Sequence, residues 1–347
     1  MWLSVSGSRA LCREPEALRV PGPVPARRTH IGSMGLNART TRLRSPNGTK
    51  MYAAQTTGRD PVEPTDIARC MNVIATFTGL RDVDAVSRDA LREVGLPEGR
   101  ADVAVLTGGA ILAGADVMAC AMRAGVARTY ALVGGIGHTT AAFRDSVHRL
   151  WPAAEFPDNA SEAEVFDAYL RSRHGLAADV LETHSTNSGN NVSFLFELLR
   201  ARGVEPRSLF VIQDATMQRR LDAVVRLQEP QVRVVNYAAY RAEVIVREGG
   251  RDGAGHGASD APGKTSLGQL GYATAPFGMW DIDYYLRLLM GEIPRLADAP
   301  EGYGPRGEGL IAHVEIPAEV QAAFEALARE FPDHVRKANP AFLHARE

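Results

Sequence analysis

Two polar clusters in the middle of the chain have the residue types and the spacing of a binding site. The first, ETHSTNSGNN, covers residues 182–191, and the second, QDATMQRR, covers residues 213–220. Between them lie a segment with helical spacing and the apolar run 209–212, which is typical of a buried strand. Each cluster begins where a strand is expected to end. In an open parallel sheet, ligands bind at the carboxyl ends of the strands, so this stretch predicts both a fold and a site.

Asp214 directly follows the second of these strands, and Gln213 precedes it. A carboxylate there is a candidate for proton transfer or for binding a hydroxyl group or a metal ion. The alternative is that it caps the next helix. Arg219 and Arg220 fall in the first turns of that helix, where a cation opposes the helix dipole. Their placement indicates an anionic partner, which is Glu182, Asp214, or a phosphate or carboxylate of a ligand.

The side chains of the first cluster offer hydrogen-bond donors and acceptors without a fixed charge. Such a set suits ribose or sugar hydroxyls and phosphate. A helix N-cap with an Asx turn would use some of them, but five polar side chains are more than one cap needs. We therefore expect a ligand-binding role for Ser185, Thr186, Asn187, Asn190 and Asn191.

A third loop, GGIGHTT at residues 134–140, follows the apolar run 130–133 and opens a helix. Its glycines allow positive φ, and successive N–H groups can form an anion-binding concavity; a tight turn without a ligand is the alternative. His138 could donate to a phosphate, act as an acid or base, or bond only to local backbone. Because no loop fits G-x-G-x-x-G and no acidic residue closes the second strand, a standard NAD site is not expected. The residues of this loop expected to contact a ligand are Gly134, Gly135, Gly137 and Thr139.

The other residues that could carry chemistry give weaker signals. Glu162 lies in the first turn of a helix that opens with the capping-box sequence SEAE at 161–164. The helix dipole stabilises an anion there without any ligand, although Glu162 could also line the site. The chain has no zinc-ligand spacing and no HExxH, GxSxG or P-loop motif, so we expect no metal site. The scattered cysteines are Cys12, Cys70 and Cys120.

Five short apolar runs alternate with helical segments along the chain. The runs are 103–106, 130–133, 180–181, 209–212 and 232–235. Continuous apolar runs are typical of parallel strands whose two faces are both covered. Strands that alternate with helices form right-handed βαβ units. The sequence therefore predicts an α/β fold with a parallel sheet.

Composition divides the chain into six segments. They are a disordered leader at 1–60, an N-terminal helical segment at 61–100, the α/β core at 101–245, a flexible glycine-rich insertion at 246–272, a C-terminal cap or lid at 273–335, and a tail at 336–347. The insertion is rich in Gly, Ala, Ser and Asp, which leaves it little apolar surface to bury.

Overall composition is that of a globular protein, with 45% apolar and 23% charged residues. The net charge is −2, and residues 1–50 carry nine basic and two acidic side chains, so the body is mildly acidic. This charge gives no support for nucleic acid as the main partner. No run reaches the roughly 18 apolar residues needed to cross a bilayer, and the N-terminus has no secretory apolar region. We therefore expect a cytoplasmic protein without direct membrane insertion.

The combination of GGIGHTT, STNSGNN, VIQDATMQRR and, near the C-terminus, GEIPRLADAPEGYGPRGEGLIAHVEIPAEV resembles the bacterial YdcF proteins. These belong to the ElyC/SanA/YdcF family, which is built on the domain of unknown function 218. The resemblance covers residues 64–330 apart from the glycine-rich insertion. It implies a Rossmann-like α/β core with a small added C-terminal portion. Together with the predicted strands and helices, the expected fold is a three-layer α/β fold with a mostly parallel five-stranded sheet and small N- and C-terminal helical additions.

The resemblance also implies a set of site residues and a ligand. Its positions in the three loops and, for Glu162, at the start of the helix after the first loop are Gly134, Gly135, Gly137, His138, Glu162, Glu182, Ser185, Asn187, Asn191, Gln213, Asp214, Met217, Arg219 and Arg220. One departure is Asn190, because the family usually has a glutamate just before the asparagine of the second loop. An amide keeps hydrogen bonding but cannot titrate. YdcF-like proteins are associated with S-adenosylmethionine binding, whereas ElyC and SanA relatives are membrane-anchored and linked to the cell envelope.

Three functions follow from these expectations. The first is binding of a nucleotide-like small molecule, with S-adenosylmethionine as the candidate, at the carboxyl edge of the sheet. The second is hydrolysis or group transfer on a phosphorylated or glycosylated envelope precursor, with Asp214 and His138 as the catalytic residues. The third is a non-catalytic role with a protein partner, in which residues 303–307 form a docking surface. Arg306 would instead contact the ligand if this segment closes over the sheet edge.

Overall fold

The computed structural model describes residues 62–137, 140–247 and 267–335. A five-stranded sheet forms its centre, with strand order β3-β2-β1-β4-β5 and parallel neighbours throughout. The strands are β1 (Ala101–Thr107), β2 (Ala127–Val133), β3 (Val180–Glu182), β4 (Ser208–Gln213) and β5 (Arg233–Ala238). All five predicted strands are present. Strand β2 begins three residues before its predicted start, and β5 continues three residues past its predicted end.

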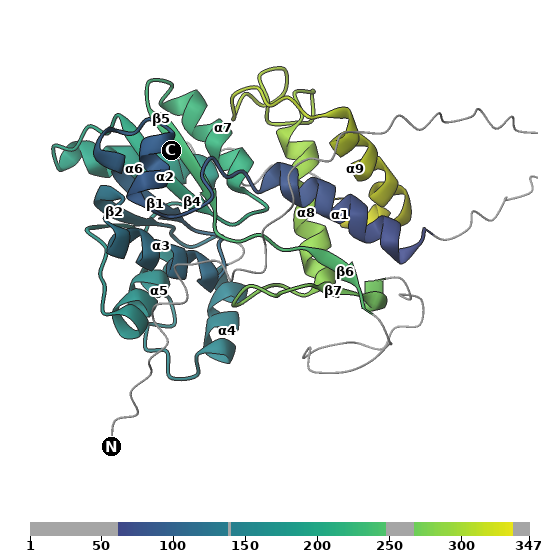
Figure 1. The fold of residues 1–347 in the computed structure, drawn as a ribbon, viewed down its shortest axis with the longest axis horizontal. Coiled ribbons are helices and arrows are strands. Elements are labelled where there is room, and N and C mark those ends of the chain that lie inside the picture. Colours follow the sequence, from purple (N-terminus) through teal and green to yellow (C-terminus); the bar gives the residue numbers. More distant parts are fainter. Residues whose placement is uncertain (1–61, 138–139, 248–266, 336–347) are drawn as a thin grey trace, which may run out of the picture.

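Helices cover both faces of this sheet (Figure 1). Helices α3 (Leu112–Ala124), α4 (Thr140–Leu150) and α5 (Glu162–Tyr169) lie on one side, and α6 (Ser188–Ala201) and α7 (Gln218–Gln228) lie on the other. Strands β1 and β4 are buried almost throughout, as expected of parallel strands between two helical layers. The α/β three-layer fold is confirmed.

Local signals in the sequence set the ends of several helices. Helix α5 begins with the predicted capping box, in which Ser161 Oγ accepts from Glu164 N and Glu164 Oε2 accepts from Ser161 N. Helix α3 ends at Gly125, whose φ of 63° lies in the left-handed region that favours glycine. These caps fix where the chain enters and leaves each layer. The strand order reverses between β1 and β4, so their carboxyl ends form the switch point at which ligands bind in such sheets.

The two ends of the described chain pack together. Helix α1 (Pro64–Thr78) contacts both α8 (Ile282–Leu296) and α9 (Ala318–Glu330), and α1 and α8 also contact α7. The three helices form one unit beside the core (Figure 1), whereas the sequence indicated two separate additions. Helix α2 (Arg88–Glu93) connects this unit to β1. In the described residues no helix combines the length and apolar character needed to cross a membrane.

A short antiparallel pair, β6 (Val244–Val246) and β7 (Leu270–Tyr272), flanks the glycine-rich insertion. The insertion was predicted to span 246–272, but its last three residues form strand β7 instead of a flexible segment. Residues 248–266 of the predicted insertion lie outside the described residues. On the side of β6 that faces away from β7, the Asn72 side chain bonds both backbone groups of Val244, at 2.8 Å each. The predicted leader and tail also lie outside the described residues.

Candidate functional site

The carboxyl ends of the strands bring the predicted loops together. Val133 and Glu182 are register partners at the ends of β2 and β3, and Gly134 N donates to Glu182 O at 3.0 Å. Gln213 lies at the end of β4, and its Nε2 donates to the O atom of Gly108, just after β1, at 2.9 Å. These bonds tie the exits of four adjacent strands into one edge, which holds most of the residues that the sequence indicated.

Glu162 is buried between the turns that follow β1 and β2. Its Oε2 accepts from Gly109 N at 2.5 Å, and its Oε1 accepts from Thr140 Oγ1 at 2.9 Å. A Cβ on Gly108 would lie 2.3 Å from Glu162 Oε2, and a Cβ on Gly134 would lie 3.2 Å from Glu162 Cβ. Glycine at these two positions therefore makes room for the carboxylate at the sheet edge.

The N–H groups of the glycine turns are already bonded within the protein. Besides the bonds above, Gly135 N donates to Ser185 Oγ at 3.1 Å, and Gly137 N donates to Thr140 Oγ1 at 2.8 Å. An anion-binding concavity requires N–H groups that point at the ligand, and these do not. A Cβ on Gly135 would lie 2.3 Å from Ser185 O, so close packing of two loops accounts for the glycine.

Glu182 folds the loop that follows β3. Its Oε1 accepts from His184 N at 2.6 Å and from Ser185 N at 2.9 Å. Its other oxygen, Oε2, is buried and has no hydrogen-bond partner. Since buried acceptors are nearly always bonded, Oε2 is a candidate acceptor for a ligand group, while Oε1 stabilises the loop.

The rest of the first polar cluster forms the start of α6. Asn187 is the N-cap, and its Oδ1 accepts from Asn190 N at 2.9 Å. Asn190 Oδ1 accepts from Thr186 Oγ1 at 3.1 Å and from Asn187 Nδ2 at 2.8 Å. Asn191 is buried in the first turn of the helix. The cap-and-turn alternative therefore accounts for these contacts of Thr186, Asn187 and Asn190.

Asp214 is the most completely buried carboxyl group at this edge, with 1% exposure. Its Oδ1 accepts from Thr216 N at 2.9 Å, Thr216 Oγ1 at 2.7 Å and Tyr240 OH at 2.8 Å, while Oδ2 has no hydrogen-bond partner. Burial raises the pKa of Asp214, and the Thr216 and Tyr240 donors oppose that rise without cancelling it. The carboxyl therefore holds its proton to a higher pH than an exposed aspartate does. The helix-capping alternative is only partly correct, because Asp214 Oδ1 stabilises the turn that precedes α7 and is not the N-cap of that helix.

Aromatic side chains that the sequence did not indicate enclose Asp214. The Trp280 side chain helps to lower the pKa of this carboxyl. Its Nε1 is buried and makes no hydrogen bond, either to Asp214 or to any other group. Burial and the nearby Asp214 raise the pKa of both Tyr240 and Tyr285. Tyr240 could have been found if the end of β5 had been placed correctly, because it lies two residues beyond that strand.

The segment between β7 and α8 also reaches the edge of the sheet from the side of β1. A Cβ on Gly278 would lie 3.3 Å from Leu150 Cδ1, at the end of α4, and 3.6 Å from Leu112 N, at the start of α3. Trp280 follows two residues later, beside Asp214. This part of the predicted C-terminal cap therefore lies against the exits of both β1 and β4.

Two of the predicted residues on α7 remain near the core. Met217 is the N-cap of α7, and a Cβ on Gly109 would lie 2.3 Å from its Cε. Arg220 pairs with Glu292 of α8, with Nε–Oε2 at 2.6 Å and Nη2–Oε1 at 3.1 Å, and its Nη1 donates to Ser188 Oγ at 2.7 Å. Its anionic partner is therefore Glu292, and not either of the carboxylates that the sequence suggested.

Arg219 and Arg306 are not brought to the sheet edge by any contact of the described residues. Arg219 Nε donates to Phe77 O, and its guanidinium stacks on the Phe77 ring at 4.2 Å from the centroid. This places it against α1. Arg306 pairs with Asp298 at 3.2 Å on the exposed surface after α8. His138 and Thr139 lie outside the described residues.

Two cavities in the described residues lie away from these polar loops. One is bounded by α1, β6 and α9 and includes Arg219; the other lies beside α5 and includes Trp151 and Glu164. The sheet edge is the stronger candidate site, because unpartnered buried polar atoms gather there. Among the described side chains no three His, Cys, Asp or Glu residues are placed to hold a metal ion. No protein-family model matches the sequence.

Proposed function

We propose that this protein binds a nucleoside-like small molecule at the carboxyl edge of its sheet, and that S-adenosylmethionine is its ligand. The supporting observation is that Glu182 and Asp214, both buried at strand exits, each keep one carboxyl oxygen without a hydrogen-bond partner. An unsatisfied buried acceptor costs about 1–3 kcal/mol. Ligand hydroxyl or amino groups that donate to these oxygens would offset that cost.

Charge at this edge favours a cationic ligand over a phosphorylated one. No ion pair with a basic side chain neutralises Glu182 in the part of the chain that the structure describes. The glycine N–H groups that could have bound a phosphate are bonded internally, and Arg219 and Arg220 have other contacts. S-adenosylmethionine carries a sulfonium and an ammonium group together with ribose hydroxyls, which matches such a set of acceptors.

The resemblance to the YdcF proteins leads to the same ligand by an independent route. It also bears on catalysis, since Asn190 replaces a glutamate that is usual in that family and cannot exchange a proton. The proposal is therefore one of binding. Hydrolysis or transfer on a phosphorylated envelope precursor has weaker support, because it would bring an anion beside buried carboxyl groups.

Calorimetric titration of the full-length protein with S-adenosylmethionine, S-adenosylhomocysteine and ATP tests the proposal. We expect S-adenosylmethionine to bind at least about tenfold more tightly than S-adenosylhomocysteine, which lacks the sulfonium charge, because one charge-assisted contact is worth about 1.5–3 kcal/mol. ATP should not bind.

Substitution of Glu182 by Gln should weaken S-adenosylmethionine binding. The matched control is Glu197→Gln, since Glu197 is exposed on α6, and it should bind like the unmodified protein. Absence of binding by all three compounds at millimolar concentration would refute the proposal. Tighter binding of ATP would instead favour the phosphorylated-substrate alternative.

A further inference from the structure

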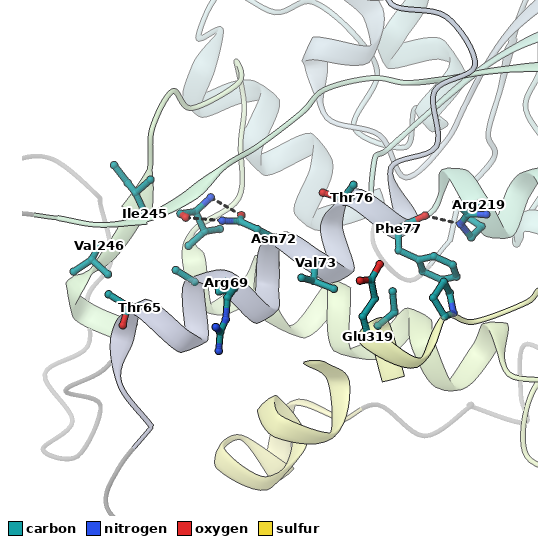
Figure 2. A pocket seen from close by; sticks show the side chains of 14 residues that line it. Thr65, Arg69, Asn72, Val73, Thr76, Phe77, Arg219, Ile245, Val246 and Glu319 are labelled. Carbon is teal, nitrogen blue, oxygen red and sulfur yellow. Dashed lines mark hydrogen bonds between the residues drawn. The ribbon is translucent and has the colours of Figure 1, made fainter. Parts of the chain in front are cut away.

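A groove of about 780 Å³ lies between α1, β6 and the start of α9 (Figure 2). Helix α1 lines it with residues three and four positions apart, from Thr65 to Phe77, which together form one face of the helix. Val73, Ile245 and Val320 make its walls largely apolar. Its volume lies within the range of about 300–1,000 Å³ that is usual for small-molecule sites.

Arg219 lies at one end of this groove. Its Nε is bonded to Phe77 O and its guanidinium rests on the Phe77 ring. Its two Nη atoms have no hydrogen-bond partner among the described residues, and no described carboxylate forms an ion pair with it. The adjacent Arg220 differs, because Glu292 neutralises it.

Two independent effects make an unpaired cation at this position unfavourable. Arg219 is in the first turn of α7, where the helix dipole repels positive charge. Burial lowers the pKa of Arg219, and Asp222 on the same helix only partly opposes this. An anion that reached the free Nη atoms would relieve both effects.

The other charged groups of the groove limit what that anion can be. Arg69 is already paired with Asp66 at 2.9 Å. Glu319 stands exposed on the rim and projects toward α1 between Val73 and Phe77 (Figure 2). A single available guanidinium beside an acidic rim matches one negative charge better than two, so a carboxylate fits better than a phosphate dianion. The two Nη atoms also match the planar geometry of a carboxylate.

We propose that this groove binds a single-chain fatty acid, with the carboxylate on Arg219 and the acyl chain along α1. The twelve residue steps from Thr65 to Phe77 give a helix face of about 18 Å, at 1.5 Å per residue. The chain would contact the apolar side chains along that face. This site shares no residue with Glu182 or Asp214 and does not depend on the function proposed for the sheet edge.

Calorimetric titration of the full-length protein with dodecanoate, below its micelle concentration and at low ionic strength, tests this site. We expect one dodecanoate per chain. Dodecanol and dodecylamine, which offer the same chain without a negative charge, should bind at least about tenfold more weakly. Equal binding of dodecanoate and dodecanol, several molecules per chain, or no binding of dodecanoate would overturn the proposal.

Two variants place the ligand in the groove. Arg219→Gln can keep the bond to Phe77 O but loses the charge, and it should weaken dodecanoate binding about tenfold or more. Arg226→Gln, which alters a more exposed arginine of the same helix, should bind normally. If Arg219→Gln does not fold, Val73→Glu supplies the test, because it puts a negative charge on the groove wall and should also abolish binding. Unchanged binding in the folded Arg219 variant, or in Val73→Glu, would contradict the assignment.

Discussion

Asp214 shows how a single side chain can have two different roles at its two oxygens. Oδ1 accepts hydrogen bonds from the turn before α7 and from the Tyr240 hydroxyl, whereas Oδ2 is buried without a hydrogen-bond partner. Burial disfavours the charged form, so the raised pKa is a property of the folded state alone. Stability must therefore depend on pH through this residue.

The free energy of unfolding should reveal that dependence when the protein is compared with Asp214→Asn. Above about pH 4 the unfolded aspartate loses its proton while the folded one keeps it. The unmodified protein should thus lose stability relative to the variant as the pH rises from about 4 toward the folded pKa. Urea denaturation at several pH values between 4 and 8 measures the difference. A difference that does not change with pH would show that the folded pKa is ordinary.

The sequence located the buried acids better than the arginines. Asp214 and Glu182 were predicted because they follow apolar runs, and a strand exit has a defined position in a parallel sheet. Arg219 and Arg220 are consecutive, so they point about 100° apart on a helix of 3.6 residues per turn. One consequently meets α1 and the other meets α8. Which neighbour each would meet depended on elements far away in the chain, and no local pattern contains that information.

At the scale of elements, the turns after β1 and β2 are built around the Glu162 carboxylate. The sequence identified the glycines of the turn after β2, but it suggested ligand-binding N–H groups as the reason. The contacts give a different reason, since the missing Cβ atoms leave space for Glu162. Spacing alone does not distinguish a glycine needed for its backbone from one needed for its lack of a side chain.

Gly108→Ala should therefore destabilise the protein. The added Cβ would lie 2.3 Å from Glu162 Oε2, and overpacking of this kind typically costs about 1–3 kcal/mol. Gly268→Ala is the matched control, because a Cβ there would meet nothing within 4 Å. Urea unfolding of both variants measures the effect. Equal stability of the two would show that the turn adjusts easily and that Glu162 is not tightly held.

At the scale of the whole molecule, the core and the terminal helices are joined through α7. Arg220 connects α7 to Ser188 of α6 and to Glu292 of α8, and the side chains of the ion pair are only 12% and 4% exposed. The attraction and hydrogen bonds of Glu292 outweigh the effect of burial and raise the pKa of Arg220. The sequence predicted the core from its repeated strands and helices. It did not predict the joining of both chain ends, because that depends on contacts between distant segments.

Glu292→Gln should loosen this connection, since it leaves the buried Arg220 without a full countercharge. Removing one partner of a buried pair costs about 3–5 kcal/mol; the amide retains some hydrogen bonding, so we expect about 3 kcal/mol or somewhat less. Glu301→Gln, at an exposed position beyond α8, should have little effect. Thermal and urea unfolding of both variants provide the measurement. A cost no larger than that of the control would mean that the ion pair does not hold the two parts together.

The contact between Asn72 and Val244 has a consequence for how copies of the protein behave toward one another. A two-stranded sheet has outer edges where unpaired backbone groups can recruit a strand from another molecule, which is a common start of aggregation. The Asn72 amide offers one donor and one acceptor to the same residue of β6, as a neighbouring strand would. It thus occupies part of that edge with a side chain that cannot propagate a sheet. One asparagine on α1 thereby leaves less of this edge open to a strand from another copy.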